Sequence, residues 1–378
     1  MNGKFRVLYV VPNYFPFVGG IETLIRTFLR NEEARDRIEP LVIFPDRLKR
    51  FHTEESYKVE GIEVIPFAGF GTEFKWARAR TASDLAKIWG SVRRITQEFK
   101  PDVIHVNGLA ELTLPFLSMA KSLAILSISH IHGEVPLNTN RTLLNFIAES
   151  TRIITVSGAV RESLLSQGFI PEKIKVLVNG VSPHLSCETI SKKRISNQLI
   201  MVGRLDSQKG FIEGLRTFNL LLKERPGLEM VVVGAGPEIG NLTQYVTSEG
   251  IGKKVRFVGP LSLEDTRDSI CSSAVLLVPS VNIEGFGLVA AEAGMCGVPV
   301  VATNVGGLPE TVIGDKSGLL VEPSNPLAMA KAVARVLSSS ELHESLGAYA
   351  KSHITKNFNH SHFAHQLLHE YSSITMRS

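Results

Sequence analysis

Short runs of apolar residues alternate with longer segments of helical hydrophobic period along the whole chain. In the first half, the apolar runs predict strands over residues 6–11, 39–44, 62–67, 102–106, 123–129, 152–157 and 173–179. In the second half, the predicted strands are QLIMVG, LEMVVVG, KVRFVG, AVLLVPS, VPVVATN and GLLVEP. Near-continuous apolar strands that alternate with helices predict parallel sheets covered by helices on both faces, so the predicted fold class is α/β.

The alternation is interrupted once, by the polar segment SPHLSCETISKKRISN, which has no clear hydrophobic period. A chain of 378 residues is longer than a single hydrophobic core usually accommodates. We therefore predict two doubly wound, Rossmann-like domains over residues 1–182 and 198–357, joined by a linker over 183–197. Because ligands bind beyond the carboxyl ends of parallel strands, we expect the chemistry in the residues that follow each strand.

Charge and cysteine content narrow the class of protein. The formal net charge is only +4, which argues against a nucleic-acid-binding protein. The whole basic excess lies in residues 1–182. The three cysteines, Cys187, Cys271 and Cys296, lack the paired spacing of a metal site, so we expect reduced thiols. FRVLYVV resembles a buried strand more than a leader peptide, and no apolar stretch reaches the roughly 18 residues of a spanning helix. A cytoplasmic protein without a metal site is expected.

Two cations follow the strand QLIMVG. Arg204 and Lys209 lie between this strand and a helix. A planar bidentate cation, a flexible point charge and a helix N-terminus would together bind a diphosphate. Two solvated loop charges would give the same sequence, and composition alone favours that alternative.

Two carboxylates follow the strand AVLLVPS, with a Gly-Phe-Gly break after the first. The break leaves Glu284 in a loop and Glu292 within the next helix, with the backbone N–H groups of residues 286–288 between them. This order suits a ligand with hydroxyl groups at both ends and phosphate in the middle, such as a nucleoside diphosphate sugar. The alternative is a helix-capping glutamate and a second glutamate that is solvated.

Histidines and glycines mark other strand ends. Gly19 and Gly20, at a helix N-terminus, would let the backbone approach a phosphate. His130 and His132 fall on the same side of their strand, which fits a metal pair or, since no third ligand is predictable, a neutral hydrogen-bonding site. His105 lies within an apolar strand, as a core histidine or a contact at the edge of the cleft.

Together these positions resemble the retaining glycosyltransferases of family 4, which have the GT-B fold of two facing Rossmann-like domains. The resemblance is carried by GRLDSQKG, VVVGAGPE, VRFVGPL, GVPVVATNVGGLPE, SGLLVEP and above all EGFGLVAAEA, which matches the family's Glu-x7-Glu motif. VPNYFPFVGGIE and ISHIHGE match less specifically. The resemblance spans nearly the whole chain. It implies an acceptor-side first domain, a donor-binding second domain, and a last helix, about 358–378, that packs back on the first domain.

The resemblance also implies roles for individual residues. Arg204 and Lys209 would bind the donor diphosphate and stabilise the leaving phosphate. Glu284 would contact the sugar hydroxyls, Glu292 the ribose hydroxyls, and His132 would lie near the transferred sugar. Catalytic roles are thus expected for Arg204, Lys209, Glu284 and His132. The donor site would be completed by glycines, backbone and a residue that seats the base: Gly19, Gly20, Gly203, Gly234, Val258, Gly285, Phe286, Gly287 and Leu288.

The implied reaction is the transfer of a sugar, with retention of configuration, from a nucleoside diphosphate sugar to a hydroxyl group of a carbohydrate or lipid-linked acceptor. No metal or other cofactor is expected, and the implied setting is the synthesis of cell-envelope or exported polysaccharide. The alternatives are an epimerase or phosphorylase of the same fold and a non-catalytic sugar-nucleotide-binding subunit. A dehydrogenase is disfavoured because the turn after the first strand lacks the dinucleotide fingerprint.

A basic segment in the first half raises a separate question. Residues 73–100 hold seven Lys or Arg, three acidic residues and two Trp. This composition is typical of an interfacial helix on an anionic membrane, and somewhat more often of an ordinary solvated helix. The first alternative would place the protein at the inner face of the membrane.

Overall fold

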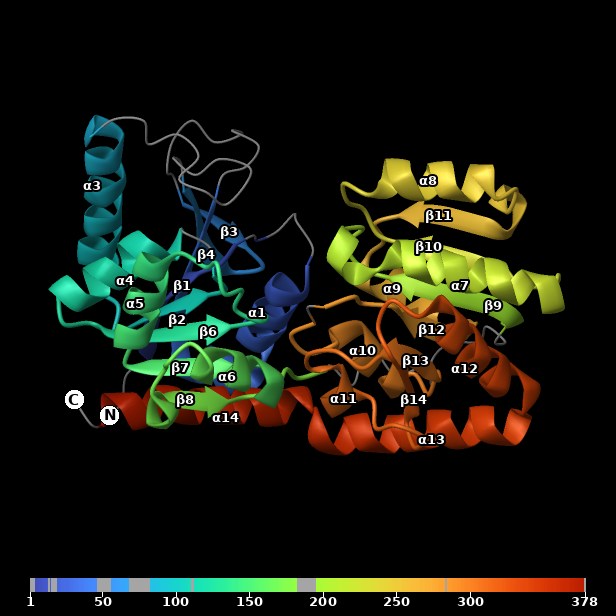
Figure 1. The fold of residues 1–378 in the computed structure, drawn as a ribbon. Helices are drawn as coiled ribbons and strands as arrows, with labels where there is room; N and C mark the ends of the chain where they lie inside the picture. Colours follow the sequence, from blue (N-terminus) through green and yellow to red (C-terminus); the bar gives the residue numbers. More distant parts are fainter. Residues whose placement is uncertain are drawn as a thin grey trace. The chain divides into compact units, whose positions relative to one another are not determined.

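The computed structural model describes residues 4–12, 14, 19–45, 56–67, 82–109, 112–181, 195–282 and 284–376. The chain divides into two compact units, the first formed by Met1–Gly180 with Ser361–Ser378 and the second by Val181–His360. Each unit contains one sheet with helices packed against it (Figure 1). Most of the predicted linker, 183–197, lies outside the described residues, and its last three residues belong to the first strand of the second unit.

The sheet of the first unit has the order β3-β4-β2-β1-β5-β6-β7-β8. Its strands are β1 (Phe5–Val10), β2 (Ile38–Pro45), β3 (Tyr57–Val59), β4 (Ile62–Phe67), β5 (Val103–Asn107), β6 (Leu126–Ile131), β7 (Arg152–Thr155) and β8 (Ile174–Val176). The strands from β4 to β8 in this order pair in parallel, as predicted. The short edge strand β3 was not predicted, and it runs antiparallel to β4. Glu60 and Gly61, both with positive φ, form the tight turn between these two strands.

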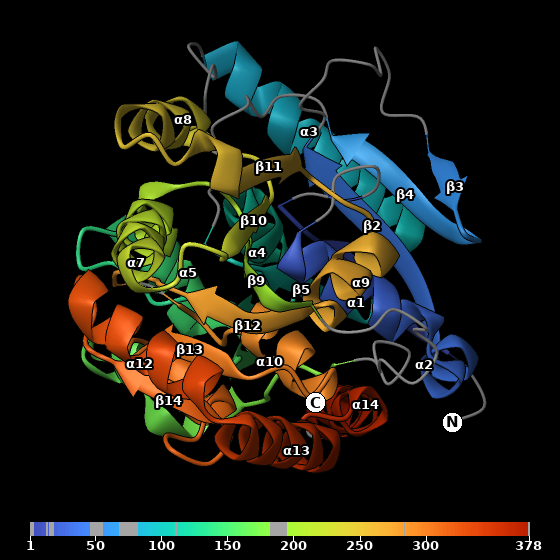
Figure 2. The same ribbon diagram turned by 90° about the vertical axis from the view of Figure 1, so that its right-hand side faces the viewer.

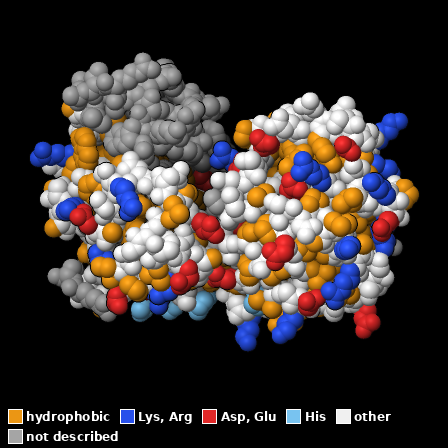
Figure 3. All heavy atoms as spheres, viewed as in Figure 1, with side chains coloured by type: hydrophobic (Ala, Val, Ile, Leu, Met, Phe, Trp, Pro, Cys, Tyr) orange, Lys and Arg blue, Asp and Glu red, His pale blue; other side chains and the backbone are white. Residues whose placement is uncertain are grey.

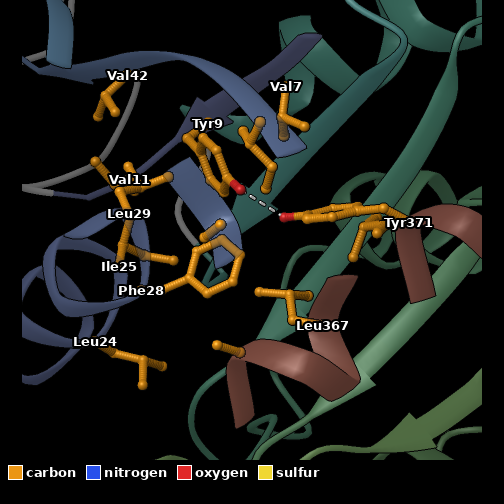
Figure 4. Close-up of a cluster of buried hydrophobic side chains, with 14 of the residues drawn as sticks. Val7, Tyr9, Val11, Leu24, Ile25, Phe28, Leu29, Val42, Leu367 and Tyr371 are labelled. Atoms are coloured by element: carbon orange, nitrogen blue, oxygen red, sulfur yellow. Dashed lines mark hydrogen bonds between the residues drawn. The ribbon is translucent and has the colours of Figure 1, made fainter. Parts of the chain in front are cut away.

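Helices cover the first sheet with their apolar faces. They are α1 (Gly20–Arg30), α2 (Glu32–Arg37), α3 (Ala82–Phe99), α4 (Thr113–Ser122), α5 (Arg141–Glu149), α6 (Gly158–Leu165) and α14 (His360–Thr375). Phe28 of α1 meets Phe363 of α14 edge to face, with ring centroids 6.1 Å apart. Figure 4 shows α1, β1 and α14 in one buried cluster, in which Tyr9 and Tyr371 share a hydrogen bond of 2.8 Å. The last helix of the chain is therefore part of the core of the first unit.

The sheet of the second unit has the order β11-β10-β9-β12-β13-β14, and every pair of neighbouring strands is parallel. Its strands are β9 (Ile195–Val202), β10 (Glu229–Val233), β11 (Val255–Gly259), β12 (Ser273–Val278), β13 (Val300–Thr303) and β14 (Gly318–Val321). The chain moves outward from β9 in one direction and then outward from β12 in the other. The strand order thus reverses between β9 and β12, which is the place where doubly wound sheets bind ligands.

Two layers of helices enclose the second sheet. The helices are α7 (Phe211–Glu224), α8 (Ile239–Ser248), α9 (Leu263–Cys271), α10 (Leu288–Met295), α11 (Leu308–Thr311), α12 (Pro326–Ser338) and α13 (Ser340–Asn357). Helices α7, α8 and α12 contribute to one buried cluster, and α9 and α10 to another on the opposite face (Figure 2). The spacing of Phe211, Leu215, Phe218 and Leu222 predicts one apolar face of α7. The first three are buried and Leu222 is partly buried.

The surface and the cysteines bear on the predicted class of protein. Lys and Arg are interspersed with Asp and Glu over the face shown in Figure 3. In the described part of the chain, no helix is long and apolar enough to span a membrane, and no group of three or more acidic, histidine or cysteine side chains could hold a metal ion. Cys271 is disulfide-bonded in the structure, so the expectation of reduced thiols is wrong for this residue.

Candidate active site

The loop after β9 is fixed to the loop after β12. Asp206 starts the 3-10 turn Ser207–Lys209, in which its Oδ1 accepts a 3.1 Å hydrogen bond from the N–H of Lys209. Gly210 has φ +64°, and a Cβ there would overlap the carbonyl oxygen of Pro279. The N–H of Val281 donates to the carbonyl of Gln208 at 2.8 Å. The two loops on either side of the strand-order reversal therefore form one structure.

Lys209 and Glu284 meet between these loops. The Nζ of Lys209 lies 2.7 Å from Oε2 of Glu284, and the Ser280 hydroxyl donates to the same carboxylate oxygen at 3.1 Å. The side chains of Lys209 and Glu284 are 33% and 12% exposed. Thr303 supports this arrangement because its hydroxyl donates to the carbonyl of Ser280 at 2.6 Å. Lys209 is thus a paired, partly buried cation and not a solvated loop charge.

Arg204 is placed differently. Its side chain is 68% exposed, and its Nε lies 3.6 Å from a carboxylate oxygen of Asp206. Such an exposed pair is weak and readily rearranged. The guanidinium can therefore turn toward a ligand, but by itself the structure also fits a solvated charge.

Glycines let the loops after β9 and β10 pack main chain to main chain. Gly234 has φ +135°, and a Cβ there would overlap the carbonyl oxygen of Gly203. The N–H of Leu205 donates to the carbonyl of Ala235, and the N–H of Glu238 donates to the carbonyl of Leu205, both at 3.0 Å. Gly203 and Gly234 hold the backbone of the loop that carries Arg204.

The Gly285-Phe286-Gly287 break is buried and packs on Phe358. Phe286 is 3% exposed and packs edge to face on Phe358, with ring centroids 5.2 Å apart. Gly287 has φ +86° and precedes Leu288, the first residue of α10, so its first N–H groups have no partner within the helix.

The GGLPE segment acts as a brace for this break. The N–H of Gly307 donates to the carbonyl of Glu284 at 2.8 Å. A side chain at Gly306 would overlap that same carbonyl oxygen. The sequence alone indicated only a tight turn here, and the bracing role depends on a contact between distant residues.

Glu292 has different neighbours from Glu284 in the structure. It is partly buried on α10 and lines a small pocket with residues of α9, among them Leu263, Thr266 and Arg267. Burial raises the pKa of Glu292 to about 7. Val258, expected near the base, is 38% exposed on the edge strand β11. The carboxylates thus have different surroundings: Glu284 is charge-paired and Glu292 is desolvated.

In the first unit, the two predicted glycines begin a helix. Gly20 is the first residue of α1, and Gly19 is its extended N-cap. The carboxylate of Glu22, itself 6% exposed, lies where a Cβ of Gly19 would be. Gly19 therefore has a packing role at the start of α1. Residues 15–18 of the same predicted segment lie outside the described residues.

His132 lies at the end of β6, with a hydrogen bond of 3.0 Å between its Nε2 and Oδ1 of Asn107. The rings of His130 and His132 lie side by side with centroids 4.1 Å apart, as strand alternation predicts. Burial lowers the pKa of His132 to about 3, so its imidazole is neutral at physiological pH. His105 is fully buried and hydrogen-bonded through Nδ1 to Tyr371, which makes it a core histidine.

Comparison with known families identifies the chain. Residues 18–185 match the family described as Glycosyltransferase Family 4, and residues 188–353 match Glycosyl transferases group 1. The chain belongs to the family 4-like glycosyltransferases of GT-B type. The two matches follow one another along the chain and together include both units.

Individual relatives in this family extend the similarity. The chain is 33% identical over 236 residues to an uncharacterised glycosyltransferase of Methanocaldococcus jannaschii, a match that spans 59% of this chain and 60% of that protein. It is 26% identical over 372 residues to a GDP-mannose-dependent alpha-(1-6)-phosphatidylinositol monomannoside mannosyltransferase of Mycobacterium tuberculosis, covering 93% of this chain and 94% of that one.

A solved structure shares the GT-B fold of this family 4-like glycosyltransferase. Anabaena HepE, in complex with UDP-glucose, superposes with a TM-score of 0.80 over 97% of this chain and 99% of that one, at 20% sequence identity. At this level of identity the likeness shows the fold, which agrees with the GT-B prediction. The roles of the individual residues rest on the geometry described above.

Proposed function

We propose that the protein transfers a glycosyl group from a nucleoside diphosphate sugar to a hydroxyl group of an acceptor, with retention of configuration and without a metal ion. The observation that carries the proposal is the Lys209–Glu284 pair, with a 2.7 Å contact at the strand-order reversal of the second sheet. A cation that binds phosphate and a carboxylate that accepts hydroxyl hydrogens are thereby adjacent.

The pairing suggests how the donor enters the site. In the structure, Lys209 and Glu284 neutralise each other. A bound diphosphate offers Lys209 a second anion, and the sugar hydroxyls offer Glu284 donors in place of the ammonium group. The donor therefore exchanges one set of polar contacts for another, and neither charge is left unpaired in a partly buried site.

The same residues would stabilise the transition state. As the bond between the anomeric carbon and the phosphate oxygen breaks, negative charge develops on the terminal phosphate of the leaving nucleoside diphosphate. Lys209, the exposed guanidinium of Arg204 and the N-terminus of α10 are sources of positive potential for that charge. The departing phosphate would accept the proton of the acceptor hydroxyl, so that the oxygen attacks from the face on which the phosphate leaves. Retention of configuration follows from that geometry.

The names of the relatives support the class of donor without fixing its base. The mycobacterial relative is named as GDP-mannose-dependent, and HepE was solved with UDP-glucose. Both are nucleoside diphosphate sugars. For this chain the proposal includes the class of donor and a carbohydrate or lipid-linked acceptor, with a role in cell-envelope or exported polysaccharide synthesis.

A panel of sugar nucleotides tests the proposal. We expect at least one donor to raise the melting temperature in the presence of a chelator, and to release nucleoside diphosphate when an acceptor or water is present. The anomeric configuration of the product, read by NMR, should match that of the donor. Binding without release would indicate a non-catalytic subunit, and inversion or a strict need for a divalent ion would contradict those parts of the proposal.

A second proposal is that the acceptor-side first unit contacts an anionic membrane through α3. Helix α3 carries exposed Lys87, Arg93 and Arg94, of which Arg94 lies 3.5 Å from Glu98, whereas residues 73–81 of the predicted segment lie outside the described residues. An interfacial role predicts co-sedimentation with anionic vesicles at low salt, and loss of it on charge reversal of Arg93 and Arg94. Absence of co-sedimentation with the wild-type protein would leave α3 as a solvated helix.

A further inference from the structure

Asn107 lies beside His132 at the carboxyl end of the first sheet. It is the last residue of β5, next to β1, and the strand order of this sheet reverses between these two strands. Asn107 is fully buried, although asparagine is mostly an exposed residue in folded proteins. It belongs to none of the positions that the sequence motifs indicate.

The surroundings of Asn107 fix the orientation of its amide. Its Nδ2 lies 3.4 Å from the carbonyl oxygen of Val10 and 3.5 Å from that of His105. Both neighbours are acceptors, so the amide nitrogen must face them and the amide oxygen must face His132. An amide oxygen only accepts hydrogen bonds, and the 3.0 Å contact therefore requires a proton on Nε2 of His132.

Among the described residues of the first unit, those around His132 offer no competing charge. The imidazole of His130 packs on the ring of His132, and the imidazole of His105 packs on His130. The phenols of Tyr371 and Tyr9 lie beyond His105. Neither ring nitrogen of His130 has a hydrogen-bond partner among the described residues, and burial keeps the pKa of His105 and His130 low. Glu134 follows two residues after His132, and burial raises its pKa. Asn107 is the polar side chain hydrogen-bonded to the ring.

We propose that Asn107 is a positioning residue that holds His132 as the Nε2–H tautomer, which leaves Nδ1 to accept a hydrogen bond from a hydroxyl group of the substrate. This inference rests on the proposed glycosyltransferase function for its substrate. A neutral acceptor of this kind selects a hydroxyl group over a carboxylate or a phosphate, since an anionic oxygen would face the lone pair of Nδ1. The site in the first unit would therefore take a neutral sugar and reject a uronic acid at the same position.

Two substitutions separate orientation from charge. Asn107→Asp keeps an acceptor beside Nε2 but places its second carboxyl oxygen beside the carbonyl oxygens of Val10 and His105. The carboxylate is then stable only with the imidazolium form of His132 as its partner. A protonated ring has no acceptor at Nδ1, so transfer should decline at acidic pH, at values where the wild type is still fully active, and recover at higher pH. Asn107→Leu removes the acceptor, and we expect transfer to fall about tenfold or more at every pH. Asn145→Asp, the same change on the exposed side of α5, is the matched control and should have the wild-type pH profile.

NMR of 15N-labelled histidine tests the tautomer without reference to activity. A His132→Gln variant assigns the His132 signals. The wild type should show a proton on Nε2 and no titration of His132 between pH 5 and 8. In Asn107→Asp, His132 should titrate at a higher pH than in the wild type. A wild-type proton on Nδ1, or an Asn107→Leu variant whose His132 signals and transfer rate match those of the wild type, would overturn the inference. If the wild type turned over no sugar nucleotide, the proposed function would fail, and the tautomer measurement would still decide the role of Asn107.

Discussion

At the scale of the residue, Glu284 has two tasks that compete. In the structure it pairs with Lys209, and in the proposed complex it accepts hydrogen bonds from sugar hydroxyls. The hydroxyl of Ser280 donates to the same carboxylate oxygen and orients the side chain. Binding of the diphosphate and recognition of the sugar are therefore separable by one substitution.

Glu284→Gln should weaken binding of the complete donor and spare binding of its nucleoside diphosphate part. The amide is a poorer acceptor for sugar hydroxyls, so the affinity for the sugar nucleotide should fall about tenfold or more. Lys209, no longer neutralised, should bind the free nucleoside diphosphate at least as tightly as before. Calorimetric titration with both ligands measures the difference, with Glu341→Gln on the exposed side of α13 as control. An equal loss for both ligands would contradict the role of Glu284 in reading the sugar.

The raised pKa of Glu292 predicts a pH dependence of the stability of the protein. Its pKa is about 7 in the folded protein, above the usual value of 4.5. Between these values the unfolded chain loses a proton that the folded protein retains, so stability falls as pH rises from about 4.5 to about 7 and is level above that. From the size of the shift, the loss amounts to roughly 3 kcal/mol.

Glu292→Gln should remove this pH dependence. In urea unfolding at pH 5 and pH 8, the variant should gain stability relative to the wild type at the higher pH. Its affinity for the nucleoside diphosphate should decrease, because the ribose hydroxyls of the proposed complex lose a carboxylate acceptor. A wild-type stability that rises between pH 5 and 8, with no difference between the two proteins, would show that Glu292 is not desolvated.

At the scale of the element, the site consists of strand ends held together by glycines. Gly210, Gly234 and Gly306 each occupy a left-handed backbone conformation at a place where a Cβ would overlap a carbonyl oxygen of a neighbouring loop. The loops that carry Arg204, Lys209 and Glu284 thus obtain their positions from main-chain contacts with each other. These contacts join residues far apart in the sequence.

Gly234→Ala should destabilise the second unit and disturb the donor loop together. The added methyl group would overlap the carbonyl oxygen of Gly203, and we expect a loss of about 2 kcal/mol or more in the free energy of unfolding. Gly227→Ala is the matched control, because a Cβ at Gly227 meets no atom within 4 Å. Chemical denaturation of both variants measures the contrast, and equal stability of the two would contradict the packing of these loops.

Most strands were predictable because their apolar runs are long and β-branched. The six strands of the second unit and seven of the first were found within a few residues of their bounds. Residues 123–125 were wrongly assigned to a strand, because they form a turn in which Ala124 has φ +52°. The edge strand β3 has only three residues, and its register depends on pairing with β4, so no periodicity marked it.

The candidate site was predictable to a lesser degree. The sequence indicated that Lys209 and Glu284 both follow strands, and the sheet order makes those two strands neighbours. Nothing in the sequence indicated the contact between their side chains, the support from Ser280 or the role of Asn107. Each of these depends on the contact of side chains from different strands, for which the chain carries no local signal.

At the scale of the whole molecule, the chain crosses from the second unit back to the first at its end. Leu367 and Tyr371 of α14 are fully buried among residues of α1, β1 and β2 (Figure 4). Helix α14 is therefore part of the core of the first unit. The core of the first unit therefore combines residues from segments far apart in the sequence.

Leu367→Ala should destabilise the first unit although the residue lies more than 180 positions after the unit's other segment ends at Gly180. A buried leucine replaced by alanine costs about 2–5 kcal/mol. His369→Ala, on the exposed side of the same helix, should have little effect. Unfolding followed by urea titration distinguishes the two, and a Leu367→Ala variant as stable as wild type would show that α14 is not part of the core.

The most direct test of the donor site is isothermal titration calorimetry of UDP, GDP and ADP, in the presence of a chelator, with the wild type, Lys209→Ala and Lys223→Ala. Lys223 lies exposed on α7 and serves as the matched loss of charge. We predict that the wild type and Lys223→Ala bind at least one nucleoside diphosphate alike, and that Lys209→Ala binds it about tenfold or more weakly. Equal binding by all three proteins, or no binding of any nucleoside diphosphate by the wild type, would contradict a donor diphosphate site at Lys209.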